Sequence, residues 1–164
     1  MACPRLLTAL ILTTAFLAHG ALAQMPPEIV APGEKVVATF HAEGAQVYEC
    51  KLGKDGKRAW VFREPIATLL LDDKTVGRHY TGPTWEHMDG SAVTGKAVGN
   101  APGATVNDIP WLKLDVANRR GSGTLANVTA VQRINTHGGA AQGGCDQAGA
   151  FLSVPYSADY VFLN

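Results

Sequence analysis

The chain has 164 residues, enough for one domain, and its 14 basic and 14 acidic residues give a formal net charge of zero. This balance argues against a protein built to hold nucleic acid or an anionic membrane surface, because both need a basic excess. With 46% hydrophobic and only 17% charged residues, the composition also argues against a disordered chain and predicts a packed globule.

Residues 1–23 have the three parts of a secretory signal peptide. Arg5 supplies a short positive segment, residues 6–17 are almost wholly apolar, and Ala21-Leu22-Ala23 is the small-x-small pattern that precedes a cleavage site. We therefore expect cleavage before Gln24, a single exported domain over residues 24–164, and a secreted or periplasmic location. An uncleaved N-terminal anchor is the alternative, which the shortness of the apolar segment disfavours.

Two cysteines, Cys50 and Cys145, remain once Cys3 leaves with the signal peptide. An even number of cysteines in an exported chain predicts one disulfide, because the compartment is oxidising. The bond would join an early strand to the loop before the last strand. Two free thiols or a metal site are the alternatives, and the lack of CxxC spacing disfavours the metal site.

The first half of the mature chain favours short strands separated by turns. A turn is expected near Glu43 and Gly44, and Asp55-Gly56 predicts a tight hairpin turn because this pair tolerates positive φ. An apolar run over residues 66–71 is too short to distinguish a buried strand from a helical turn. The strands predicted here are residues 36–40, 46–51 and 59–63.

The second half shows the clearest alternation with a period of two. Leu112, Leu114 and Val116 share one face of a half-buried strand. A short helix over residues 125–132 is an alternative to a strand there, and residues 138–149 are a Gly-rich loop. Many short strands predict an all-β fold, either a compact sandwich or a small barrel, with one disulfide. The strands predicted in this half are residues 111–117, 128–136 and 156–163.

The motifs of several large enzyme classes are absent. The sequence contains no GxGxxG, Walker A, HExxH or EF-hand pattern, and no GxSxG nucleophile elbow. These absences argue against nucleotide binding, a zinc protease of the HExxH type and an α/β-hydrolase. An enzyme with a dispersed site stays open.

Residues 77–91 form the densest polar and aromatic segment. The aromatic faces of Tyr80 and Trp85, beside His79 and Asp89, are typical of a sugar-binding platform. The structural alternative, which we favour for most of the segment, is a β-turn at Asp89-Gly90-Ser91 with Trp85 in the core and His79 hydrogen-bonded.

A metal or catalytic group is the third interpretation of this segment. His79 and His87 with Glu86 or Asp89 would supply suitable ligands. The two histidines match no standard ligand spacing, so we assign no metal and no catalytic residue.

A second polar cluster lies near residue 133. Its side chains either line a groove or hold the neighbouring Gly-rich loop, and we favour the second interpretation because Arg133 would satisfy carbonyls of that loop. Its members are Gln132, Arg133, Asn135, Thr136 and His137.

Five groups of residues, in order along the chain, resemble one known family. They are QVYEC (46–50), GRHYTGPTWEHMDGS (77–91), IPWLKL (109–114), QRINTHGG (132–139) with Cys145, and PYSADYVF (155–162). The family is the secreted family of bacteria and fungi catalogued as domain of unknown function 3455. The resemblance implies a compact exported β-rich domain, with the two cysteines as a family feature, and it implies no established activity.

Two details of the resemblance need comment. Some fungal relatives carry dehydrogenase names, but this chain has no dinucleotide fingerprint and no helical pattern for a Rossmann unit, so we predict no cofactor. Gln142 stands where the family's Ala-Pro is expected after the glycines, which affects the geometry of the loop before Cys145.

We therefore predict an exported binding or envelope-associated module whose partner is a small molecule or glycan, with carbohydrate as one candidate ligand. The alternatives are an extracellular enzyme that uses His79, Glu86 and Asp89 as acid/base or metal groups, and a purely structural secreted protein. We expect no nucleic-acid partner and no integral membrane segment after signal cleavage. The candidate ligand-binding residues are His79, Tyr80, Trp85, Glu86, Asp89 and Arg133.

Overall fold

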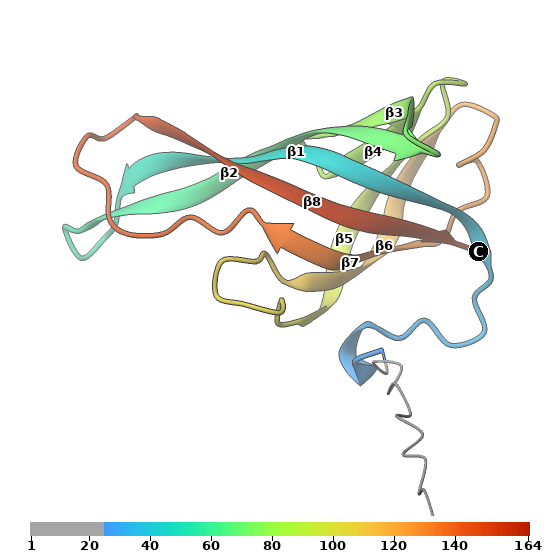
Figure 1. The fold of residues 1–164 in the computed structure, drawn as a ribbon, viewed down its shortest axis with the longest axis horizontal. Helices are drawn as coiled ribbons and strands as arrows, with labels where there is room; N and C mark the ends of the chain where they lie inside the picture. The colour runs from blue at the N-terminus through green and yellow to red at the C-terminus, as the bar shows by residue number, and fades with distance from the viewer. Residues whose placement is uncertain (1–24) are drawn as a thin grey trace, which may run out of the picture.

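The computed structural model describes residues 25–164, so the predicted signal peptide lies outside the described residues. Eight antiparallel strands, each paired with the next in sequence, form a barrel that closes between the first and the last (Figure 1). This confirms the all-β prediction in its barrel form. The strands are β1 (Val36–Leu52), β2 (Arg58–Leu71), β3 (Lys74–Tyr80), β4 (Thr84–His87), β5 (Ala92–Ala101), β6 (Trp111–Arg120), β7 (Ala130–Gly138) and β8 (Phe151–Leu163), preceded by a 3-10 turn, η1 (Pro27–Ile29).

The predicted turn at Glu43 and Gly44 is wrong, because β1 runs through both residues as one continuous strand. Gly44 lies opposite Ala67 of β2, and a Cβ atom at this position would collide with the carbonyl oxygen of Ile66. The glycine therefore permits close approach of two strands and does not mark a reversal of the chain.

Residues 66–71 are strand, which decides the question that the apolar run leaves open. They continue the predicted strand over residues 59–63 into one element, β2, which contains Pro65. Pairing of β2 with β3 begins only at Ala67, so Pro65 lies next to an unpaired edge, where a proline is tolerated. The helix considered for residues 125–132 does not form, since β7 begins at Ala130.

Alternation along the strands builds the core inside the barrel. The inward face of β8 carries Tyr156, Ala158, Tyr160 and Phe162, all of which are almost completely buried. Large side chains from the other strands pack against this face. The loop between β6 and β7 closes one end, because its apolar side chains insert into the core. The main contributors are Phe40, Leu69, Trp85, Val93, Leu114, Leu125, Val128 and Val131.

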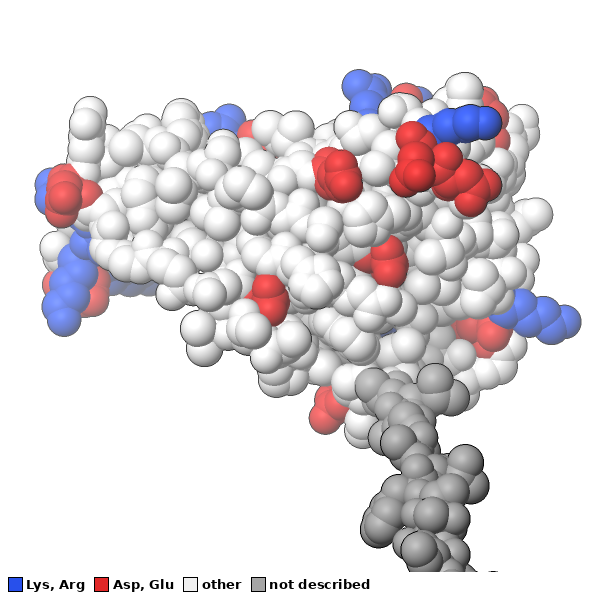
Figure 2. Space-filling model, viewed as in Figure 1, with Lys and Arg blue, Asp and Glu red and all other residues white. Residues whose placement is uncertain are grey.

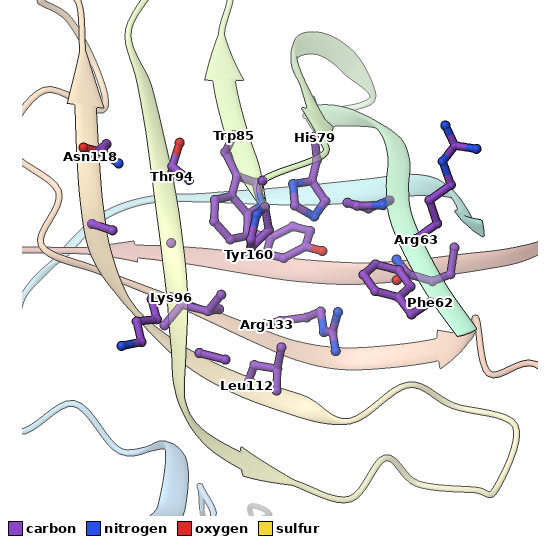
Figure 3. Close-up of a pocket in the computed structure, with 18 residues that line it drawn as sticks. Phe62, Arg63, His79, Trp85, Thr94, Lys96, Leu112, Asn118, Arg133 and Tyr160 are labelled. Atoms are coloured by element: carbon purple, nitrogen blue, oxygen red, sulfur yellow. The ribbon is translucent and has the colours of Figure 1, made fainter. Parts of the chain in front are cut away.

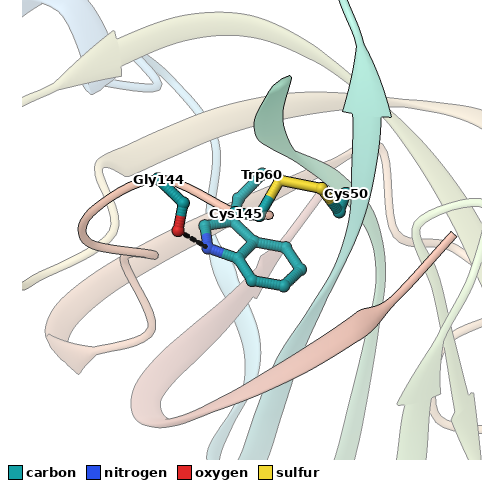
Figure 4. The surroundings of a disulfide bond; sticks show 4 residues. All are labelled: Cys50, Trp60, Gly144 and Cys145. Carbon is teal, nitrogen blue, oxygen red and sulfur yellow. Dashed lines mark hydrogen bonds between the residues drawn. A yellow bond between two sulfur atoms is a disulfide. The ribbon is translucent and has the colours of Figure 1, made fainter. Parts of the chain in front are cut away.

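At the other end β1, β2 and β8 continue past the barrel as a three-stranded projection, seen on the left of Figure 1. The predicted disulfide between Cys50 and Cys145 is present and ties the β7–β8 loop to this projection (Figure 4). Beside it the indole nitrogen of Trp60 donates to the carbonyl of Gly144 at 3.1 Å. The disulfide and this hydrogen bond therefore anchor the long, glycine-containing β7–β8 loop to strands β1 and β2.

On the face shown in Figure 2, acidic side chains are scattered over the middle and the upper right, whereas basic side chains lie mostly along the edges. No helix within residues 25–164 is long and apolar enough to cross a membrane.

Candidate functional site

The wall of the barrel is open on one side because the β3–β4 hairpin is short. β2 contacts β3 only from Ala67 onward, and β4 contacts β5 only through three residue pairs that begin at Thr84 and Thr94. The first half of β2 and the second half of β5 therefore face each other without a strand between them. The turn that joins β3 to β4, at Gly82 and Pro83, borders this opening.

A cavity of about 730 Å³ lies behind the opening. Its base is buried in the barrel and its rim is exposed to solvent. Figure 3 shows the side chains that line it. The buried lining residues are Gln46, Pro65, His79, Trp85, Gly95, Leu114 and Tyr160, and the exposed ones are Phe62, Arg63, Gly82, Lys96, Ala97, Ala117 and Asn118.

Three aromatic side chains pack together at the base. His79 of β3 and Trp85 of β4 are a cross-strand pair, and their rings stack with centroids 4.5 Å apart. The ring of Tyr160 meets the indole edge-on at 5.2 Å. Trp85 is only 1% exposed, and Nδ1 of His79 lies 2.9 Å from the carbonyl of Thr84. This confirms the prediction that Trp85 lies in the core and that His79 is hydrogen-bonded.

Burial keeps His79 neutral. Desolvation lowers the pKa of its imidazole to about 3, aided by the charge of Arg133, although the hydrogen bond to Thr84 acts in the opposite direction. Because Nδ1 donates its proton to that carbonyl, Nε2 carries the lone pair. His79 therefore contributes a flat, uncharged ring to the cavity.

We predict that acid destabilises the protein through His79. Unfolded histidine takes up a proton near pH 6.5, whereas the folded imidazole stays neutral down to about pH 3. Between pH 6.5 and 4.5 the free energy of unfolding should therefore fall by about 2 to 3 kcal/mol more than in His79→Gln, as measured by urea denaturation. Equal losses in the two proteins would contradict this assignment. The lowered pKa values of Glu86 and Asp89 cost stability mainly as pH falls below the unfolded values of 4.5 and 3.8, and this loss is shared by both proteins in the comparison.

Two buried donors on the lining have no acceptor within residues 25–164. They are the indole Nε1 of Trp85 and the amide Nε2 of Gln46. The Gln46 amide has the hydroxyl of Tyr156 as a hydrogen-bonding neighbour, which leaves the indole N–H of Trp85 as the clearer case of a donor without an acceptor. An indole N–H can only donate, and burying it without an acceptor costs about 1 to 3 kcal/mol.

Arg133 of β7 also lines the cavity. Its Nε and Nη2 donate to the carbonyl of Pro110 at 3.0 and 2.8 Å. The expectation that this side chain satisfies the Gly-rich loop is therefore wrong. A different side chain bonds to that loop: the Tyr48 hydroxyl donates a hydrogen bond to the carbonyl of Gly139.

Tyr80 and Glu86 lie on the outer face of the sheet, away from the cavity. The Glu86 carboxylate accepts hydrogen bonds from the Tyr80 hydroxyl and from the guanidinium groups of Arg78 and Arg120. Hydrogen bonds from Tyr80 and then Arg78 lower the pKa of Glu86 to about 2. This exposed network links β3, β4 and β6.

Asp89 fastens the loop that closes one end of the barrel. Its carboxylate accepts from the backbone and hydroxyl groups of Ser91 and of Thr124. The Ser91 hydroxyl in turn accepts from the backbone N–H of the buried Leu125. Hydrogen bonds from Ser91 and then Thr124 hold the pKa of Asp89 well below its usual range. The predicted turn at Asp89-Gly90-Ser91 is confirmed.

We predict that Asp89→Ala lowers Tm by roughly 5 °C, because two hydrogen bonds from Thr124 that fasten the β6–β7 loop and two from Ser91 within the β4–β5 turn are lost. Calorimetry should show a clearly smaller change for Asp115→Ala, an exposed aspartate on β6. An unchanged Tm in Asp89→Ala would contradict this structural role.

The six candidate residues therefore fall into two groups. His79, Trp85 and Arg133 line the cavity, whereas Tyr80, Glu86 and Asp89 are held by partners elsewhere. Tyr80 and Trp85 occupy opposite faces, so they do not form one sugar-binding platform. His79 and Glu86 are separated in the same way, and no three His, Cys, Asp or Glu side chains gather within residues 25–164 as a metal site would need.

Sequence reasoning missed most of the cavity. Gln46 and Leu112 were not candidates, although alternation with their neighbours would have placed them inside. Gly95 also carries a signal, because a Cβ there would lie 3.1 Å from the Trp85 ring. A glycine within a strand marks close packing of this kind.

One family model matches the chain, over residues 31–73 and 70–164. Its description is "Protein of unknown function (DUF3455)". No curated protein and no solved structure shows a significant match.

Proposed function

The chain belongs to the DUF3455 family, and we propose that this member binds a small, largely apolar molecule inside its barrel. A cavity of about 730 Å³ is of the size that small-molecule sites occupy. Its apolar walls with a few polar groups also match such sites. The interior of an eight-stranded barrel is either filled by side chains or wide enough for one small ligand, and here side chains fill only part of it.

The cavity, with its largely apolar lining, carries this proposal. The buried indole N–H of Trp85, one of the lining residues, has no acceptor within residues 25–164, so a ligand acceptor that reaches it would remove an existing cost. A purely structural barrel would gain stability by filling the space with side chains. The enzyme alternative is less favoured, because His79 does not meet Glu86.

We further propose that binding takes place outside the cytoplasm. The predicted signal peptide over residues 1–23 and the disulfide support export, since such bonds persist in oxidising compartments. An exported binding module would carry or sense its ligand in the periplasm or the medium.

Binding is tested with Nile red, a neutral apolar dye whose fluorescence rises on leaving water. We expect saturable binding that weakens at least tenfold in Ala97→Phe, which fills the cavity from β5. Val98→Phe is the matched control, because Val98 is an exposed neighbour that does not line the cavity. Absence of binding, or equal weakening by both variants, would overturn the proposal. Soluble oligosaccharides, used as competitors of the dye, test the carbohydrate alternative.

A further inference from the structure

We infer that the ligand of the cavity is an organic anion, a carboxylate on a largely apolar body, which binds with its charged group toward Arg133 and the Trp85 indole. This inference rests on the proposed function, because it names the chemical class of the same ligand. It goes further by assigning a polarity and a charge to each part of the cavity.

The charges that line the cavity are all positive. Arg63, Lys96 and Arg133 contribute side chains, and no Asp or Glu does. Within residues 25–164 neither Lys96 nor Arg133 forms an ion pair, while Arg63 pairs with its neighbour Glu64. A cationic ligand would meet only like charge here, whereas an anion would be attracted.

Arg133 is the cation placed to act inside. Figure 3 shows its guanidinium among the other lining side chains, whereas the ends of Arg63 and Lys96 point away from them. Its two hydrogen bonds go to the carbonyl of Pro110, which is uncharged, so its positive charge keeps no carboxylate partner within the described residues. A half-buried guanidinium of this kind favours a carboxylate, with which it makes a charge-assisted hydrogen bond.

One orphaned donor favours the same chemistry. The indole N–H of Trp85 has no acceptor within residues 25–164, so an acceptor on the ligand that reaches this nitrogen would remove an existing cost. An ionised carboxylate only accepts hydrogen bonds, so it suits a lining on which donors are in excess. His79 adds no competing charge, because its imidazole stays neutral.

The remaining walls fit an apolar body. Phe62, Pro65, Leu112 and Leu114 line the cavity together with the indole ring. They remove apolar surface of the ligand from water, which contributes about 25 cal/mol per Å². A fatty acid and a flat aromatic acid share this chemistry, and the experiment distinguishes them.

The experiment measures binding by isothermal titration calorimetry at neutral pH. The probes are octanoate and naphthoate, each compared with its neutral amide, octanamide or naphthamide. We expect at least one acid to bind about tenfold more tightly than its amide, and Arg133→Gln to remove that difference by weakening the acid more than the amide. Arg58→Gln, at an exposed arginine of β2 outside the cavity, should leave both affinities intact.

Each outcome has a separate meaning. Preference for octanoate would identify an aliphatic acid, and preference for naphthoate an aromatic one. Equal affinity of acids and amides, or an acid preference that survives in Arg133→Gln, would overturn the anion inference and leave the proposed function standing. Failure of all four compounds while Nile red binds would also overturn it. Failure of Nile red as well would overturn the proposed function itself.

Discussion

Replacing Trp85 by alanine lowers the free energy of unfolding by about 3 to 5 kcal/mol, because the ring is fully buried and its removal leaves a void. The indole packs against His79 and Tyr160, which lose their stacking and edge contacts with it. Urea denaturation measures the loss. Trp111→Ala is the control, since that ring is only half-buried and should cost about 1 to 2 kcal/mol.

Trp85→Phe separates the ring from its N–H group. An aromatic ring stays in the core, so the free energy of unfolding should fall by less than about 2 kcal/mol. Binding of octanoate or naphthoate should nevertheless weaken, because the donor is gone. A loss below about 1 kcal/mol for Trp85→Ala would contradict the placement of this residue at the base of the cavity.

Removing the disulfide is expected to have an effect of similar size. Cys50 and Cys145 are 95 residues apart, and closing a loop of that length constrains the unfolded chain by about 4 to 5 kcal/mol in the chain-entropy model. The double variant Cys50→Ser/Cys145→Ser should be less stable than the native protein by up to that amount in urea denaturation. Reduction of the native protein should bring its stability close to that of the variant.

The double variant also serves as the control for the reductant. It has no disulfide to reduce, so adding the reductant should leave the stability of this variant unchanged. Thiol labelling of unreduced, unfolded protein that lacks residues 1–23, and with them Cys3, checks the bond directly and should find no free thiol. Stoichiometric labelling, or a stability change below about 1 kcal/mol, would contradict the pairing.

The strands near residues 112–116 and 156–162 could be predicted because half-buried strands alternate with a period of two. The continuous strand through Gly44 could not. Locally, Glu43-Gly44 is a typical turn pair, and only the contact with Ile66 explains the glycine. That contact is made by a different strand, so no local pattern contains it.

The candidate site was located only in part, for a related reason. His79 and Trp85 stand out because large aromatic and imidazole side chains are uncommon, and both line the cavity. Tyr80 and Glu86 were grouped with them by nearness in sequence. In a hairpin, however, successive side chains point to opposite faces. Gln46 was missed because the expected turn broke the alternation that begins at Phe40.

The most direct measurement follows the indole N–H groups in a proton–nitrogen correlation spectrum while octanoate or naphthoate is added. The chain has three tryptophans, and Trp85→Phe identifies the resonance of Trp85. The account predicts that this resonance moves to the position of a hydrogen-bonded indole at saturation. The resonance of Trp60, already bonded to Gly144, should stay in place. A Trp85 resonance that does not change at saturating ligand would contradict binding in this cavity.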